Sequence, residues 1–365
     1  MKIEVNNNSV TFNYNNHAVE IHPIWLRERV DNREFLDKKT SQRLFDPSLL
    51  ENIKIENAVI NQNLLEISFN DGVKSNYEIS KLTAELMDSE NLSNTVNSIL
   101  WDGQLKKYPT YVFTDEFFKS REMFNLLKSF YEYGFVIIKN LPKENNFIIK
   151  FANSIGSIRP TNFGKYFNVK SLPRPNDLAY TSLPLSPHTD NPYRKPVPCI
   201  QLLHCIENEV SGGYSTLVDG FKVANHLKAN NKSFFDILTK IKVKFKFIDK
   251  NVVLENDGQL IELDEDKNLK QVRFSTRLDY VPILKKDKLD LYYKARKKIS
   301  ELYNSKEFKI EFKLIPGDLL MMDNHRLLHG RTNYDSNEGK RFLQGCYIDY
   351  DSSEGKFRHL KRNFG

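Results

Sequence analysis

"PGDLLMMDNHRLLHGR", residues 316–331, combines a turn, a strand and two histidines in one short segment. Pro316 and Gly317 are typical of a turn, and the apolar run after them is typical of a buried strand. The residues that follow bring up His325 and His329, four positions apart. The segment therefore predicts a strand that delivers an imidazole to a buried site. Spacing alone leaves open which of the two histidines is used.

The other part of this site lies upstream, in "SPHTDNPYRKP", residues 186–196. In an extended segment the side chains of His188 and Asp190 point to the same side. Such a pair by itself is usually a surface feature or a turn. Joined by a histidine from 316–331, it supplies two imidazoles and one carboxylate. Non-heme Fe(II) oxygenases use this ligand set, because their chemistry needs vacant positions on the metal.

Short apolar strands with Gly and Pro turns fill most of the chain from about residue 180 onward. Helical stretches such as 285–303 interrupt them, and no βαβ alternation is visible. This pattern predicts a mainly β fold with flanking helices, a double-stranded β-helix or jelly roll. The first 80 or so residues also alternate like strands and include an Asp71-Gly72 hairpin turn, and residues 80–100 have helical spacing.

We therefore predict two domains, a small β-rich N-terminal domain (1–100) and a jelly-roll oxygenase domain (101–365). The three cysteines form no disulfide framework, and the first residues have no apolar stretch typical of a secretory signal. No apolar segment approaches the ~20 residues that span a bilayer. We expect a cytoplasmic protein that binds no membrane. The net charge of +7 is scattered along the chain, so we also expect no nucleic-acid partner.

Four motifs together resemble one family: SPHTDNPY, QLLHCIE, SGGYSTLVDGF and PGDLLMMDNHRLLHGR. They are similar to the 2-oxoglutarate-dependent oxygenases that hydroxylate γ-butyrobetaine and trimethyllysine, a branch of the taurine dioxygenase group. The resemblance covers nearly the whole chain and is densest from 177 to 347. It implies Fe(II) as cofactor, 2-oxoglutarate and O2 as co-substrates, succinate and CO2 as products, and a homodimer. It also implies that the catalytic metal ligands are His188, Asp190 and His329, with His325 left out.

The resemblance further assigns the pocket around the metal. Arg341 would bind the far carboxylate of 2-oxoglutarate, for which a planar guanidinium is suited, with help from Ser215. An aromatic box would hold a trimethylammonium group by cation–π attraction. The resemblance places this box at Phe163, Phe167, Tyr180 and Tyr347, and a further substrate-binding position at Asp177. Asn191 and Tyr193 are added to the substrate-binding positions because they stand beside the metal ligand in DNPYR.

Several positions depart from the relatives. Phe163 and Phe167 stand where the relatives carry Tyr and Trp, which are stronger partners for a cation. Asp177 stands where butyrobetaine hydroxylases carry Asn and trimethyllysine hydroxylases carry Asp. A carboxylate there would repel the carboxylate of γ-butyrobetaine. A second carboxylate-binding Asn is replaced near Ser275 and Thr276. Arg194 is a further candidate, suited to a phosphonate or a carboxylate.

The N-terminal domain lacks the zinc ligands that the resemblance places there. Val30, Asn32 and Phe35 stand in place of cysteines, and Val73 stands in place of a histidine. We expect the same fold without zinc, stabilised by apolar packing of these residues.

The expected activity is hydroxylation of a small trimethylammonium compound, similar to γ-butyrobetaine or trimethyllysine. The same mechanism acting on a phosphonate or sulfonate, such as trimethylaminoethylphosphonate or taurine, is the alternative. A non-catalytic jelly-roll binding protein is a more distant one, and it predicts neither bound iron nor consumption of 2-oxoglutarate.

Overall fold

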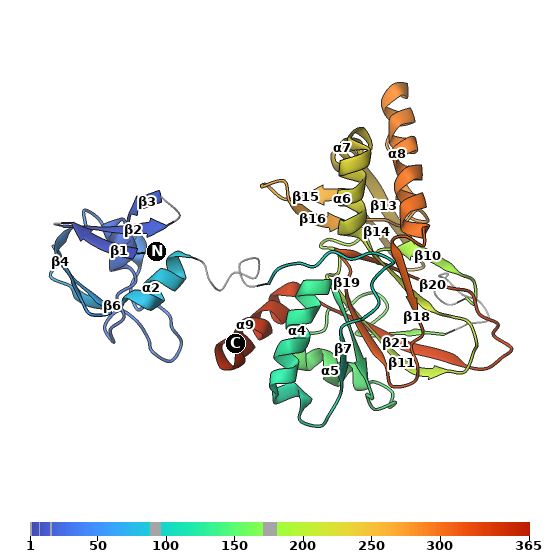
Figure 1. Ribbon diagram of the computed structural model, residues 1–365, viewed down its shortest axis with the longest axis horizontal. Coiled ribbons are helices and arrows are strands. Elements are labelled where there is room, and N and C mark those ends of the chain that lie inside the picture. The colour runs from blue at the N-terminus through green and yellow to red at the C-terminus, as the bar shows by residue number, and fades with distance from the viewer. Residues whose placement is uncertain (1, 7, 15–16, 88–95, 171–180) are drawn as a thin grey trace. The chain divides into compact units, whose positions relative to one another are not determined.

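The computed structural model describes residues 2–6, 8–14, 17–87, 96–170 and 181–365. The chain divides into two compact units, Met1–Thr95 and Val96–Gly365 (Figure 1). No helix in the described part of the chain has both the length and the apolar character that crossing a bilayer requires.

The N-terminal unit contains two antiparallel three-stranded sheets and short helices. The first sheet consists of β1 (Lys2–Asn6), β2 (Ser9–Tyr14) and β3 (His17–Glu20), and the second of β4 (Ile55–Asn61), β5 (Leu64–Phe69) and β6 (Lys74–Glu78). The helices are α1 (Pro23–Arg27), the 3-10 helix η1 (Pro47–Leu49) and α2 (Ile79–Leu86). Alternate residues of β5, namely Leu65, Ile67 and Phe69, enter the core, as the two-residue period of a half-buried strand requires.

Two local predictions in this unit have different outcomes. The Asp71-Gly72 turn is confirmed, since β5 and β6 pair from Ser68 and Lys74 outward and Gly72 has φ +82°. The predicted helix over 80–100 is confirmed as far as Leu86, where α2 ends, and is wrong for 96–100, which are not helical; residues 88–95 lie outside the described part of the chain. Leu82 is the buried residue of α2, and Ile79 and Leu86 on the same face pack against the core of the unit.

Two larger sheets form the C-terminal unit. The six-stranded sheet has the order β7 (Thr110–Val112), β8 (Phe135–Lys139), β19 (Leu319–Asp323), β11 (Ile200–Asn208), β21 (Arg341–Ile348) and β9 (Phe167–Val169), and all its pairs are antiparallel except β7–β8. The four-stranded antiparallel sheet has the order β10 (Leu185–His188), β20 (Leu327–Arg331), β12 (Ser215–Asp219) and β18 (Lys309–Phe312).

An apolar core joins the two sheets. It contains Phe135, Leu320 and Met322 from the first sheet and Leu217 and Leu327 from the second. Two mainly antiparallel sheets that share an inner apolar layer form the double-stranded β-helix expected from the sequence. The central strands read as continuous apolar runs because helices cover their other face.

Helices flank the sheets on two sides (Figure 1). The helices on the side of the six-stranded sheet are α4 (Arg121–Tyr133), α5 (Phe147–Ile155) and α9 (Tyr350–Phe364). The short 3-10 helix η2 (Phe117–Lys119) directly precedes α4. Gly134 ends α4 with φ +78°, the left-handed cap that favours glycine.

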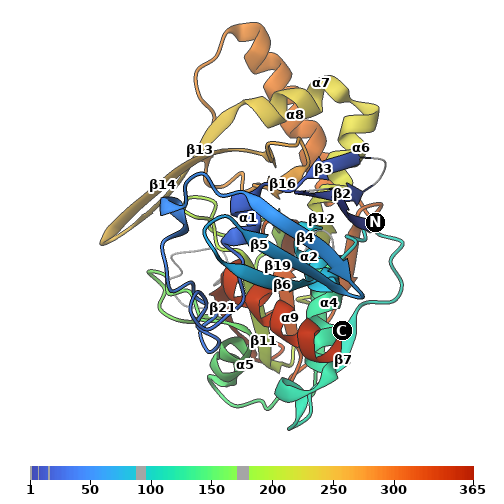
Figure 2. The same cartoon turned by 90° about the vertical axis from the view of Figure 1, so that its left-hand side faces the viewer.

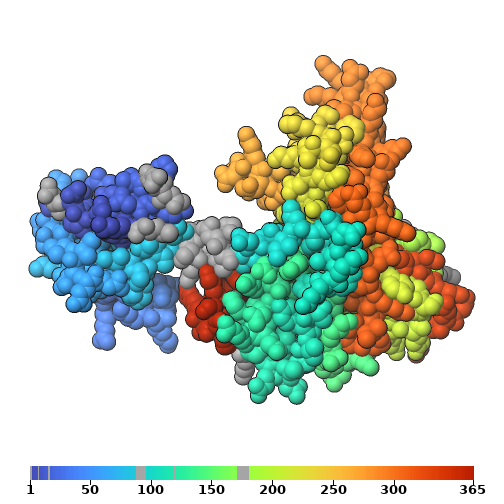
Figure 3. Space-filling model, in the orientation of Figure 1, coloured from blue at the N-terminus to red at the C-terminus, as the bar shows by residue number. Residues whose placement is uncertain are grey.

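A projecting layer lies beyond the four-stranded sheet. It contains the helices α6 (Gly220–Asn230), α7 (Lys232–Lys240) and α8 (Lys286–Asn304) and the strands β13 (Lys242–Asp249), β14 (Val252–Gln259), β15 (Ile261–Leu263), β16 (Leu269–Val272) and β17 (Asp279–Tyr280). Figure 2 shows the long β13–β14 hairpin extending beneath α7 and α8. In the space-filling view, α7 and α8 form a distinct lobe of this unit (yellow and orange, Figure 3).

Candidate active site

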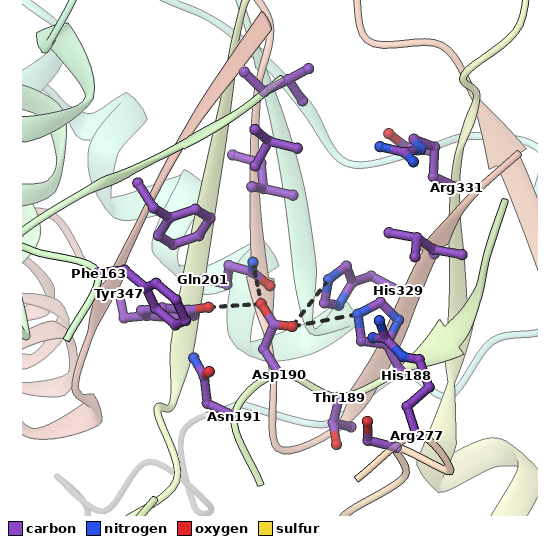
Figure 4. Close-up of a pocket in the computed structure, with 18 of the residues that line it drawn as sticks. Phe163, His188, Thr189, Asp190, Asn191, Gln201, Arg277, His329, Arg331 and Tyr347 are labelled. Carbon is purple, nitrogen blue, oxygen red and sulfur yellow. Dashed lines mark hydrogen bonds and ion pairs between the residues drawn. The ribbon is translucent and has the colours of Figure 1, made fainter. Parts of the chain in front are cut away.

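The three predicted metal ligands meet in a pocket between the two sheets (Figure 4). His188 ends β10, and its direct partner across the ladder to β20 is His329, so their rings lie 4.4 Å apart between centroids. Asp190 follows two residues after His188. Its Oδ1 lies 3.5 Å from His188 Nε2 and 3.8 Å from His329 Nε2. Among the described residues, this is the one group of three potential ligands close enough to share an ion.

His325, the other histidine left open by spacing, does not reach this site. Its Nε2 lies 3.1 Å from the carbonyl oxygen of Val197, and its ring meets that of Tyr350 edge to face. It precedes β20, whereas His329 lies within that strand. A Cβ on Gly330 would lie 2.5 Å from the carbonyl oxygen of Leu185, so this glycine allows β10 to approach β20 closely beside the histidine.

The protonation of these groups suits a divalent metal. His188 Nδ1 lies 2.9 Å from the Ser186 carbonyl oxygen, to which it donates, so its Nε2 lone pair points toward the other two groups. Burial lowers the pKa of His329 to about 3, so this imidazole is neutral at neutral pH. Burial would raise the pKa of Asp190, but the two imidazoles and the Tyr347 hydroxyl outweigh it and the pKa falls below its ordinary value. Two imidazole nitrogens and a carboxylate are the donors that Fe(II) takes in oxygenases.

Three other side chains form hydrogen bonds with Asp190. The sequence motifs did not predict this role for any of the three. Its Oδ2 accepts hydrogen bonds from Gln201 Nε2 and from the Tyr347 hydroxyl, both at 2.7 Å. The side chain of Asn324 binds both the N–H and the C=O of Asp190. Gln201 stands among the apolar residues Ile200, Leu202 and Leu203 of β11, which is a usable signal, because a buried amide requires hydrogen-bond partners.

Arg341 and Ser215 line the same pocket, and both are buried. The guanidinium of Arg341 lies over the ring of Tyr334, 5.4 Å from its centroid. Gly213 lies against it with φ +69°, and a Cβ there would approach Arg341 Nε to 2.9 Å. In the described part of the chain Arg341 has no carboxylate partner, and its buried Nε has no hydrogen-bond partner. A buried cation of this kind requires an anionic ligand, and the far carboxylate of 2-oxoglutarate meets that requirement.

A second guanidinium, Arg331, also lines this part of the pocket and was not predicted. It donates to the carbonyl oxygens of Thr181 and Leu183 at 2.6 and 2.7 Å. Burial and the charge of Arg341 both lower the pKa of Arg331, to about 10, so it remains a cation at neutral pH. The two arginines make this part of the pocket strongly electropositive.

Aromatic rings form another wall. The rings of Phe167 and Tyr347 lie 5.4 Å apart between centroids, and Phe163 lines the same pocket. Tyr193 lines it too, and its hydroxyl donates to Asn191 Oδ1 at 2.5 Å. The structure thus brings Phe163, Phe167, Asn191, Tyr193 and Tyr347 to the metal site, in a pocket of about 980 Å³ of empty space, part of it open to solvent.

The remaining candidates have different positions. Asp177 and Tyr180 lie outside the described residues. Arg194 does not line the pocket and instead donates to Asn162 Oδ1. Ser275 lines the pocket, whereas Thr276 does not and is exposed. Arg277, which was not predicted, is an exposed residue that also lines the pocket, close to His188 in Figure 4.

Fold and site together define an Fe(II)- and 2-oxoglutarate-dependent dioxygenase. Residues 110–347 match the model of one family, described as "Taurine catabolism dioxygenase TauD, TfdA family". The chain belongs to this family.

Relatives match over most of the chain. γ-Butyrobetaine dioxygenase of Homo sapiens is 29% identical over 351 residues, covering 93% of this chain and 90% of that protein. γ-Butyrobetaine dioxygenase of Pseudomonas sp. (strain AK-1) is 27% identical, with 93% and 90% covered. Mitochondrial trimethyllysine dioxygenase of Bos taurus is 28% identical, with 93% and 82% covered.

Solved structures support the fold at lower identity. Asparagine oxygenase in complex with Fe(II), 3-hydroxyasparagine and succinate has a TM-score of 0.51 at 14% identity, covering 74% of this chain and 90% of that one. The non-heme iron oxygenase OrfP in complex with Fe, succinate and a hydroxyarginine has a TM-score of 0.50 at 14% identity, covering 66% and 94%. These structures confirm the predicted jelly-roll architecture.

The donor set fits Fe(II), and the buried Arg341 fits 2-oxoglutarate. His188, Asp190 and His329 would hold Fe(II), which would supply O2 activation with 2-oxoglutarate, held by Arg341, as the electron donor. The chain itself positions the reactants. Apolar side chains of Val169, Leu203 and Leu343 line the pocket beside the polar groups and help to exclude water from it. As a member of this family, the enzyme uses O2, 2-oxoglutarate and a small organic substrate.

Proposed function

We propose that the enzyme hydroxylates a small trimethylammonium compound, similar to γ-butyrobetaine or trimethyllysine. In this proposal His188, Asp190 and His329 hold the iron, and Arg341 with Ser215 holds 2-oxoglutarate. The names of the most similar relatives support this substrate class. The observation that carries the proposal is the wall of Phe163, Phe167 and Tyr347 in the same pocket as the metal ligands.

The physical reason is the attraction of a cation to aromatic faces. Each ring contributes about 0.5–2 kcal/mol, depending on how dry the site is. Phe163 is itself held edge to face by Phe247 at 5.7 Å between centroids, so the wall is supported from behind. Burial of methyl groups against these rings adds to the attraction.

The test is a panel of substrates scored for succinate formation coupled to a hydroxylated product. It contains γ-butyrobetaine, trimethyllysine, trimethylaminoethylphosphonate and taurine. Turnover of at least one trimethylammonium compound is expected, with taurine inactive. Consumption of 2-oxoglutarate with none of the trimethylammonium compounds hydroxylated would overturn the substrate class and leave the oxygenase assignment intact.

Two variants sharpen this test. Phe163→Leu and Phe167→Leu keep apolar volume and remove the π face. Each should raise KM about 2- to 30-fold for the trimethylammonium substrate, which corresponds to 0.5–2 kcal/mol. The carbon isostere 5,5-dimethylhexanoate matches γ-butyrobetaine in shape without the positive charge. Its binding should change much less in the same variants.

A second candidate function is oxidation, by the same mechanism, of a substrate whose anionic group is a phosphonate or a sulfonate. The guanidinium of Arg277 lines the pocket and favours an anion there. A substrate recognised mainly by its anion would tolerate both leucine variants. Arg277→Gln would then raise KM for that substrate and leave the KM for 2-oxoglutarate unchanged.

We also infer a homodimer in the cytoplasm, as the sequence and the family resemblance imply. Light scattering of the full chain should give twice its monomer mass. Cell fractionation should recover the protein in the cytosolic fraction. A monomer, or recovery with membranes or another compartment, would contradict these two points without affecting the chemistry.

A further inference from the structure

The two oxygens of the Asp190 carboxylate have different surroundings (Figure 4). Oδ1 faces the imidazoles of His188 and His329 at 3.5 and 3.8 Å. Oδ2 faces the other way and accepts two hydrogen bonds at 2.7 Å, from Gln201 Nε2 and from the Tyr347 hydroxyl. One oxygen is therefore directed at the metal position, and the lone pairs of the other are occupied by protein donors.

The two donors form a fixed pair. Gln201 on β11 and Tyr347 on β21 are direct partners in the six-stranded sheet, and they are 2% and 4% exposed. The two histidines belong to the four-stranded sheet. Asp190 lies between the two sheets. Its carboxylate therefore connects the two imidazoles of the four-stranded sheet to the two hydrogen-bond donors of the six-stranded sheet.

This arrangement matters for the number of open positions on the metal. A carboxylate can bind a metal through one oxygen or through both. With both oxygens bound, Asp190 would occupy a position that 2-oxoglutarate or O2 requires. Hydrogen bonds to a ligating carboxylate also fix its orientation and tune its affinity for the metal.

We infer that Gln201 and Tyr347 are positioning residues that hold Asp190 as a one-oxygen ligand of the iron. The inference goes beyond the proposed function, because it depends on the iron chemistry and not on which substrate is bound. It also gives Tyr347 a second role. Its ring lies against Phe167 in the substrate pocket, while its hydroxyl holds the metal ligand.

Tyr347→Phe separates these two roles, because it keeps the ring and removes the hydroxyl. Gln201→Leu removes the other donor at similar volume. Tyr350→Phe is the matched control, because this half-buried tyrosine also donates to a carboxylate, Asp323 Oδ1, at 2.5 Å, outside the metal site. Full-length protein is used throughout, and circular dichroism melting shows whether each variant is folded.

The first readout is affinity for Mn(II), measured by the loss of the free-ion electron paramagnetic resonance signal. Tyr347→Phe and Gln201→Leu should each weaken binding about 10-fold or more, as loss of an outer-shell partner typically does. The second readout is the visible spectrum of the Co(II)-loaded protein. It should shift in both variants if Asp190 turns to bind through both oxygens, and it should stay unchanged in Tyr350→Phe.

Mn(II) affinity within twofold of the wild type in both variants, with unchanged Co(II) spectra, would overturn the inference. If Tyr347→Phe does not fold, Gln201→Leu decides alone. Neither readout involves the organic substrate. Failure of the substrate panel therefore leaves this inference standing, and failure here leaves the substrate class untouched.

Discussion

The side chain of Asn324 binds the backbone of Asp190 on both sides. Its Oδ1 accepts from the Asp190 N–H at 2.7 Å, and its Nδ2 donates to the Asp190 carbonyl at 3.0 Å and to that of Pro198 at 2.9 Å. Asn324 is 1% exposed. Asn324, which directly follows β19, thus fixes the backbone of the metal ligand, while Gln201 and Tyr347 fix its side chain.

Asn324→Ala should cost both stability and metal affinity. It leaves three backbone groups without their partner, and each buried group costs about 1–3 kcal/mol, so a total on the order of 3 kcal/mol is expected after relaxation. Urea unfolding measures the loss, and Mn(II) titration measures the affinity. Asn304→Ala is the control, since Asn304 donates to the Ser300 carbonyl from an exposed helix position. Equal effects of the two substitutions would contradict the role of Asn324.

Arg341 should determine affinity for 2-oxoglutarate and leave iron binding unchanged. Charged hydrogen bonds in a buried site are worth about 1.5–3 kcal/mol, so Arg341→Met should raise KM for 2-oxoglutarate by roughly 10- to 150-fold. Arg341→Lys keeps the positive charge but lacks the planar guanidinium. Its KM for 2-oxoglutarate should therefore lie between those of the wild type and Arg341→Met. Steady-state succinate formation measures KM. Arg358→Lys, at a helical ion pair with Glu354, serves as the control. A change in Mn(II) affinity comparable to the change in KM would contradict this assignment.

Gly345 leaves room for the ring of Phe167. The two residues are paired across β21 and β9, and a Cβ on Gly345 would lie 2.4 Å from two ring carbons of Phe167. Gly345→Ala must therefore displace that ring. We expect KM for the trimethylammonium substrate to rise about tenfold, the size of one strong cation–π contact, with KM for 2-oxoglutarate within twofold. Gly355→Ala, where a Cβ would meet nothing within 4 Å, is the matched control.

Much of the metal site could be predicted from the sequence because its ligands lie in short, ordered segments. His188 and Asp190 follow from their spacing, and a strand carrying a histidine follows from the apolar run before it. The choice of His329 over His325 required the family resemblance, because spacing does not show that β20 begins only at Leu327.

The supporting residues could not be predicted in the same way. Gln201 contacts a residue 11 positions away and Asn324 one 134 positions away, and only the strand register brings them there. The length of α2 was also missed, because helical spacing in 80–100 does not show where tertiary packing stops supporting a helix. Sequence patterns thus identify ligands more readily than the groups that orient them.

His204 should make the protein sensitive to acid. It lies in β11 with 0% exposure, and among the described residues neither of its ring nitrogens has a hydrogen-bond partner. Burial lowers its pKa from 6.5 to about 4. Below pH 6.5, His204 therefore binds a proton in the unfolded chain but stays neutral in the folded protein until the pH approaches 4. Stability is fully present above pH 6.5 and falls as the pH drops toward 4.

The expected loss from this one histidine between pH 7.5 and 5.5 is about 1 kcal/mol. Urea unfolding at the two pH values, compared between wild type and His204→Leu, isolates it. His204→Leu should be more stable at pH 5.5 and should show a smaller pH dependence. His359→Gln changes an exposed histidine of α9 and serves as the control. The same pH dependence in wild type and His204→Leu would refute the prediction.

The N-terminal unit has apolar and ionic packing at the positions where the family resemblance implies zinc ligands. Val30 is buried, and Phe35 and Val73 pack against the same core. Asn32 instead accepts hydrogen bonds from the backbone N–H groups of Glu34 and Phe35. Arg27, which was not predicted to contribute, bonds Asp71 at 2.7 Å and lies 4.3 Å from the centroid of the Phe35 ring.

We therefore expect this unit to be insensitive to chelators and sensitive to Arg27. The Arg27 side chain is 5% exposed, and breaking a buried ion pair on one side typically costs about 3–5 kcal/mol, so Arg27→Ala should destabilise the unit by about 3 kcal/mol. Hydrogen exchange of peptides from residues 17–87 in the full chain measures this, with and without EDTA. Arg43→Ala, at a partly exposed pair with Glu28, should cost about 1 kcal/mol or less. Faster exchange on adding EDTA would show that a metal stabilises the unit, because structural zinc contributes its binding energy to folding.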